Sequence, residues 1–145
     1  MSSSTYIRPE SLWAASGFYY QAIEMNVATT GMYTILSNSI IDTQGFIYNN
    51  SFNTSYPDEN LMSFDDDGAG SNKQFMITVV LEAMTKYILF VTTYVGNTLG
   101  TFSIIGLGPG TINFLESKQN LYKLQTDTLR EFLSDKMQYL SKRKE

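Results

Sequence analysis

The sequence predicts an all-β fold: a jelly-roll-like antiparallel β-sandwich of seven to eight strands, followed by a C-terminal amphipathic α-helix. Short runs rich in β-branched and aromatic residues recur at near-regular spacing with turn residues between them, which is typical of sandwiches and barrels. Ten Tyr and nine Phe accompany a single Trp, and flat aromatic side chains pack well on sheets. The apolar period changes from two to about 3.6 only near the end of the chain.

The chain divides into three predicted segments. Residues 1–17 form a polar leader, in which Thr5–Ile7 adds an edge strand. Residues 18–110 form the sandwich, and their number suits a single domain. Residues 111–145 form a helical appendage.

The strands are predicted from the alternation of apolar and polar residues. From Tyr19 on, Gln21 and every second residue up to Val27 share one face. Gly45 lies inside the third strand and predicts a bulge or a close approach of another backbone segment. Gly106–Gly110 ends the sheet region. The strands after the first are predicted at 32–37, 42–48, 61–64, 74–81, 86–94 and 101–105, with Phe75, Ile77, Val79, Leu81, Leu89 and Val91 in the core.

The last segment changes to a helical period. The helix is predicted from about Phe114 to about Lys142, with lysines and acids opposite its apolar stripe. A helix of this length either packs along the sandwich or finds a partner helix. Its stripe contains Leu115, Tyr122, Leu129, Leu133, Met137 and Leu140.

Composition excludes several kinds of functional site. The chain contains no cysteine and no histidine. It therefore has no disulfide, no Cys- or His-ligated metal, and no Ser-His or Cys-His catalytic pair. We predict that it is not an enzyme.

Charge and hydropathy bear on partners. Three basic and nine acidic residues up to Leu115 give this part of the chain a net charge of −6, which opposes nucleic-acid binding. No run is long enough for a transmembrane span. The first residues lack the pattern of a signal peptide.

The loop after the fourth predicted strand concentrates negative charge. Asp65, Asp66 and Asp67 are consecutive and are followed by Gly68, while Asp42 opens the third predicted strand. Such charges repel unless a cation, backbone N–H groups or full solvation compensates them. One interpretation is a Ca²⁺ site built from these four aspartates and backbone carbonyls. The other is a solvated turn whose Asp side chains accept hydrogen bonds from backbone N–H groups. The spacing does not match an EF-hand.

Five tyrosines allow two interpretations. They form a flat aromatic surface for a glycan or protein ligand, or they form cross-strand pairs and core. We favour the second for the strand positions, whereas Tyr56 lies in a polar loop. The five are Tyr19, Tyr20, Tyr48, Tyr56 and Tyr94.

The order of the motifs resembles the bacterial pre-peptidase C-terminal domain and its relatives, which also occur in tandem in surface proteins of rotifers. These relatives are calcium-associated β-sandwich modules appended to secreted enzymes and surface proteins. In the turn after the fifth predicted strand, Met84 stands where the family usually has Gly. The matching runs are 19–27, 31–35, 42–48, 63–68, 85–91 and 100–104.

The resemblance implies a non-catalytic extracellular binding or adhesion module with calcium as its cofactor. Its partner is then a protein or glycan, and its location the cell surface or extracellular space, as part of a larger protein. Sequons at Asn49 and Asn53 fit a secreted protein. The alternative is a structural or assembly domain that forms homo-oligomers or contacts its parent protein through the C-terminal helix.

Overall fold

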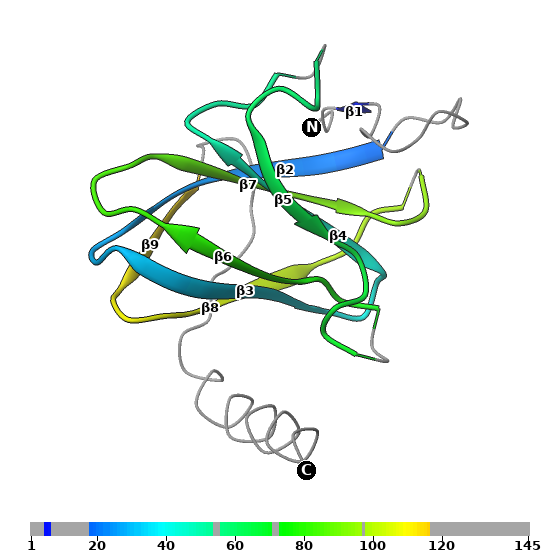
Figure 1. Ribbon diagram of the computed structural model, residues 1–145. Helices are drawn as coiled ribbons and strands as arrows, with labels where there is room; N and C mark the ends of the chain where they lie inside the picture. The colour runs from blue at the N-terminus through cyan, green and yellow to red at the C-terminus, as the bar shows by residue number, and fades with distance from the viewer. Residues whose placement is uncertain (1–4, 7–17, 54–55, 71–72, 97, 117–145) are drawn as a thin grey trace.

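Two antiparallel β-sheets pack against each other in the computed structural model, which describes residues 5–6, 18–53, 56–70, 73–96 and 98–116 (Figure 1). The larger sheet has the order β1-β2-β7-β4-β5, and β9 also pairs with β2. The smaller sheet has the order β6-β3-β8. The predicted all-β class is therefore confirmed. The strands are β1 Thr5–Tyr6, β2 Phe18–Val27, β3 Gly31–Ser39, β4 Thr43–Asn49, β5 Leu61–Asp65, β6 Met76–Leu81, β7 Tyr87–Thr93, β8 Phe102–Leu107 and β9 Ile112–Glu116.

The core between the sheets is built by the alternation that the sequence predicts. Along β2, Gln21 and every second residue up to Val27 are buried, and the residues between them are half-buried. Successive side chains of a strand point to opposite faces, so this pattern assigns one face to the core. The core contains Ile23, Met25, Val27, Tyr33, Ile35, Ile47, Phe75, Ile77, Leu81, Tyr87, Leu89, Val91 and Ile104, with Val79 packed against it.

A second, aromatic cluster lies on the opposite face of the larger sheet. Phe46, Tyr48 and Phe90 are fully buried there. Their neighbours along β4 and β7 point to the other face of the sheet, into the core between the sheets. Tyr20 stacks on Phe90 with ring centroids 4.5 Å apart, and Phe52 lies 4.4 Å from the same ring. Tyr20 and Tyr48 therefore take part in cross-strand packing, as predicted for tyrosines in strands.

Gly45 lies where β4 passes close to the start of β6. A Cβ atom at this position would lie 2.6 Å from Cδ2 of Phe75, which is fully buried. The close neighbour of Gly45 is therefore an aromatic side chain and not the predicted backbone segment. The register shift in the β4–β5 pair lies elsewhere, between Ile47 and Tyr48.

The sheet region extends beyond its predicted end. Instead of starting a helix, residues 112–116 form β9, which pairs with β2 from Val27 to Ile23. Ile112 and Phe114 pack against the core, whereas Leu115 is 49% exposed. The local period is therefore two, and the prediction that the helix starts at about Phe114 is wrong.

The remainder of the predicted helix, residues 117–145, lies outside the described residues. No described residue is helical, so this part of the chain has no helix suited by length and apolarity to crossing a membrane. In the predicted leader, Thr5–Tyr6 form β1 and pair with Tyr19 and Phe18. This pairing confirms the predicted edge strand.

Candidate functional site

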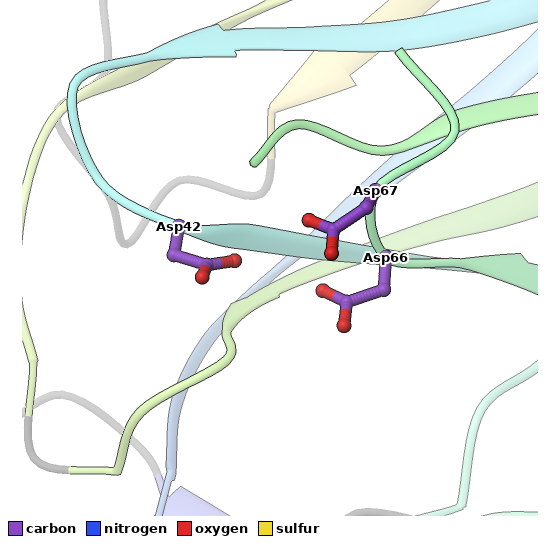
Figure 2. Close-up of side chains that lie close together, drawn as sticks. All are labelled: Asp42, Asp66 and Asp67. Carbon is purple, nitrogen blue, oxygen red and sulfur yellow. The ribbon is translucent and has the colours of Figure 1, made fainter. Parts of the chain in front are cut away.

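Three of the four aspartates predicted as cation ligands meet at one end of the sandwich (Figure 2). Strands β4 and β5 are antiparallel and pair Gly45 with Asp65. Asp42, which precedes β4, therefore lies beside Asp66 and Asp67, which follow β5. One carboxylate oxygen from each of the three side chains lies within 4.8 Å of the other two. The register of the sheet thus brings together two loops that are distant in sequence.

This acidic cluster, Asp42, Asp66 and Asp67, is partly shielded from solvent. Asp42 and Asp66 are half-buried and Asp67 is exposed. The Oδ1 atoms of Asp42 and Asp66 are themselves buried. Like charges repel more strongly where water is excluded. A cation held between the three carboxylates would offset this repulsion.

Asp65 does not join the cluster. Its Oδ2 accepts hydrogen bonds from the backbone N–H of Gly68 at 2.7 Å and from that of Met76 at 2.8 Å. The first bond closes the turn after β5, and the second ties this turn to the start of β6. Asp65 therefore behaves as the second interpretation of the acidic loop predicts: its carboxylate accepts hydrogen bonds from backbone N–H groups.

Lys73 brings a positive charge to the edge of the cluster. Its Nζ lies 3.9 Å from Oδ2 of Asp42, and its side chain is 72% exposed. A pair this exposed contributes about 0–1 kcal/mol to stability. Lys73 therefore offsets only part of the negative charge, and its exposed side chain does not block access to the carboxylates.

A buried polar network supports the loop that carries Asp42. Oε1 of Gln74 accepts hydrogen bonds from the hydroxyls of Ser37 at 3.0 Å and Thr43 at 3.2 Å. Nε2 of Gln74 donates to the carbonyls of Ile41 at 2.7 Å and Lys73 at 2.8 Å. All three polar side chains are buried. Gln74 thus connects the residues on either side of Asp42 to the loop between β5 and β6.

Backbone hydrogen bonds complete this connection. The N–H of Thr43 donates to the carbonyl of Lys73 at 3.1 Å, and the N–H of Tyr94 donates to that of Asp42 at 3.1 Å. Gln74 and Lys73 are parts of the site that were not predicted from the sequence. The available signal was weak: Gln74 directly precedes the apolar alternation that starts at Phe75.

The donor set determines which ions suit the site. Three carboxylates offer between three and six oxygens, and Ca²⁺ takes six to eight oxygens at flexible geometry. Backbone carbonyls and water would supply the remainder. Mg²⁺ demands stricter octahedral geometry and retains more of its water. The arrangement therefore suits Ca²⁺ better.

Tyrosines do not form a shared flat surface in the described part of the chain. Tyr48 is buried, and its hydroxyl donates to the carbonyl of Pro57 at 2.8 Å. Tyr56 is 69% exposed and Tyr94 is 51% exposed. Tyr56 lies in the loop between β4 and β5, whereas Tyr94 follows β7 beside Asp42.

Comparison with known proteins gives no match: no family model, curated protein or solved structure is significantly similar to this chain. The resemblance to the pre-peptidase C-terminal domain therefore stays a prediction.

Proposed function

We propose that this chain is a non-catalytic extracellular binding or adhesion module, and that a calcium ion stabilises its acidic end. The observation that carries the calcium proposal is the convergence of Asp42, Asp66 and Asp67 from two loops to within 4.8 Å. An oxygen-only ligand set suits a hard cation. The sandwich-like fold agrees with the resemblance to calcium-associated modules.

The proposal that the module is non-catalytic rests on the side chains available. The chain contains no histidine and no cysteine, so the common nucleophile–base pairs cannot form. Hydrolysis of a glycosidic bond by two carboxylates needs them on opposite sides of that bond, roughly 5–9.5 Å apart. The cluster instead gathers its oxygens around one point, which suits holding an ion.

Thermal unfolding of the full chain with calcium and with chelator tests the calcium site. A ligand that binds only the folded state adds RT ln(1 + [L]/Kd), which is about 2.7 kcal/mol at a hundredfold excess over Kd. We expect a higher midpoint in millimolar calcium than in EGTA. Equal midpoints would contradict the proposal.

Neighbouring aspartates provide matched variants for this test. Asp66→Asn should abolish the calcium effect and, in EGTA, raise the midpoint, because one repelling charge is removed. Asp65→Asn should lower the midpoint in both buffers while calcium still raises it, because Asp65 bonds backbone N–H groups and lies outside the cluster. Glu82→Gln removes one negative charge from the exposed turn between β6 and β7 and should leave the calcium effect unchanged.

A further inference from the structure

The outer face of the smaller sheet, which points away from the larger sheet, consists of uncharged residues. In β3, Tyr33 and Ile35 face the core, so Leu36 and its alternate neighbours point outward. Residues paired across antiparallel strands share a face, which extends the outer face onto β6 and β8. A sheet face in contact with water is normally polar. The outer face is formed by Met32, Thr34, Leu36, Asn38, Met76, Thr78, Val80, Ser103, Ile105 and Leu107.

One part of the outer face is buried. Leu36 and Ile105 pair across β3 and β8 and are 5% and 3% exposed, although neither belongs to the core or to the aromatic cluster. Met32 and Val80 pair at the other end of the same face and are 64% and 55% exposed. A bare sheet would expose both pairs to a similar degree. No described strand lies on this side of the smaller sheet (Figure 1), so the Leu36–Ile105 pair requires a cover that the described strands do not supply.

The chain leaves the described fold beside this pair. A Cβ atom on Gly106 of β8 would meet the side chains of Ile112 and Phe114, so β9 runs alongside β8, an edge strand of the smaller sheet. Gly106 directly follows Ile105, and β9 ends at Glu116. The sheets of a sandwich lie about 10 Å apart, and an extended residue spans about 3.3 Å. The polar residues 117–120 are therefore long enough to pass the edge of β8 and reach the outer face.

The residues that follow carry an apolar stripe that needs a partner. The sequence predicts an amphipathic helix here, and such a helix gains its stability by packing its apolar side. Charge also favours contact with the sandwich: the chain from Glu116 on has seven basic and five acidic residues, a net charge of +2, whereas the chain up to Leu115 has a net charge of −6.

The chain's own C-terminal part is a better cover than the other candidates. A short linker holds the stripe beside the outer face at an effective concentration on the order of millimolar, which exceeds that of a second copy in dilute solution. Residues 7–17 are less suited, because both their ends are fixed at the Tyr6–Phe18 pair of the larger sheet.

We propose that residues 121–140 pack their apolar stripe on the outer face of the smaller sheet, over Leu36 and Ile105. The C-terminal part of the chain then forms a third layer of the domain. Of the two roles open to the predicted helix, packing along the sandwich or finding a partner helix, this proposal selects the first. It does not depend on the proposed calcium site.

Thiol labelling of the full chain tests the proposal, since the sequence contains no cysteine. Ile105→Cys places a single thiol under the proposed cover, and Met32→Cys places one at the exposed end of the same face. In the folded proteins, a maleimide should react with the thiol at position 105 at least about tenfold more slowly than with that at position 32, because reaction requires access. Circular dichroism will verify that both variants keep the fold.

A change in the stripe should uncover position 105. Added to Ile105→Cys, Leu129→Asn/Leu133→Asn should raise the labelling rate at least about tenfold, because two apolar side chains of the stripe become polar. Ser134→Asn/Gln138→Asn is the matched control: it alters polar positions of the same predicted helix and should leave the rate within about twofold. Leu129→Ala/Leu133→Ala replaces the asparagine pair if that pair unfolds the sheets.

Each outcome supports or overturns the proposal. Rapid labelling of Ile105→Cys in the parent background would overturn the cover itself. Protection that survives the changes at Leu129 and Leu133 would overturn the stripe as its source. Protection lost on dilution, together with a dimer that dissociates over the same concentrations in sedimentation, would overturn it in favour of a second copy. Protection that is independent of protein concentration and is lost only in the stripe variant supports it. The same labelling rates are expected in calcium and in EGTA, so the calcium proposal is decided separately.

Discussion

Gly45 and Phe75 are in such close contact that a Cβ atom on Gly45 would overlap the ring of Phe75. The missing Cβ of Gly45 leaves space for a fully buried ring, 2.6 Å from where that atom would be. Both residues lie near the acidic cluster. Their sequence neighbours Thr43 and Gln74 are hydrogen-bonded to each other in the buried polar network that supports the loop of Asp42. The close approach therefore helps to set the distance between the two loops that carry the aspartates.

Gly45→Ala should destabilise the fold. The ring of Phe75 would have to move within a packed core, which costs roughly 1–3 kcal/mol. Chemical denaturation should show a lower midpoint with an unchanged slope. Ala83→Gly, in the turn between β6 and β7, is the control. It changes a small residue outside the core and the aromatic cluster, so its midpoint should fall less than that of Gly45→Ala. A parent-like midpoint for Gly45→Ala would mean that Phe75 repacks without cost.

Asp65 and Asp66 show what residue-level prediction lacks. The sequence identified the acidic loop and Asp42 as neighbours, because antiparallel strands bring such segments together. It did not distinguish Asp65, which accepts backbone hydrogen bonds, from Asp66 and Asp67, which turn toward Asp42. That distinction depends on where β5 ends and how the turn to Gly68 closes. Three identical side chains in a row carry no signal for either.

At the scale of the element, the turn between β6 and β7 adopts a conformation that suits glycine. Met84 has a φ of 64° and is 99% exposed. The left-handed region costs a non-glycine residue roughly 1–2 kcal/mol. Its side chain gains little packing in return, because almost all of it is exposed.

Met84→Gly should stabilise the protein. Removing the steric cost outweighs the greater flexibility of glycine in the unfolded chain, which leaves a net gain of about 0.5–1 kcal/mol. Thermal unfolding should show a midpoint a few degrees higher. Met32→Gly, at an exposed position of strand β3 without positive φ, should instead lower the midpoint. A lower midpoint for Met84→Gly would contradict the argument from φ.

Strand β9 is the element that the sequence misassigned. Leu115 fits a 3.6-residue stripe with later leucines, but Ile112 and Phe114 alternate with polar or exposed neighbours and pack on the core. Five residues are too few to separate the two periods. The deciding factor is the unpaired edge of β2, which a single sequence does not reveal.

Two truncations measure the contribution of β9. A chain ending at Glu116 should remain folded, because it retains every described residue of both clusters, and the loss of the proposed cover over Leu36 and Ile105 should lower its melting midpoint. A chain ending at Thr111 should lose roughly 2–4 kcal/mol more, since it exposes the edge of β2 and removes two packed side chains. Sedimentation of the chain ending at Glu116 also tests the assembly alternative. If this chain keeps its melting midpoint but loses the self-association of the full chain, the assembly alternative is favoured. A large drop in the midpoint of this chain would instead show that residues 117–145 stabilise the fold.

At the scale of the whole molecule, alternation and turn residues were sufficient to predict two-sheet, all-β architecture. The inward positions of β2 and β6 follow directly from a period of two. The strand order cannot be predicted from this period, because β2 pairs with β7, and β4 pairs with both β5 and β7. Such pairings between segments distant in sequence depend on how the two sheets share the core.

Strand β2 holds both ends of the described fold. β1 pairs Thr5 with Tyr19, and β9 pairs Glu116 with Ile23, so the two ends face positions four residues apart. At about 3.3 Å per residue this is a separation of roughly 13 Å along the strand. A few residues would join Glu116 to Thr5 and close the chain into a circle. For the same reason, a host protein could accept this domain as a side branch within one of its surface loops, with entry and exit along a single strand.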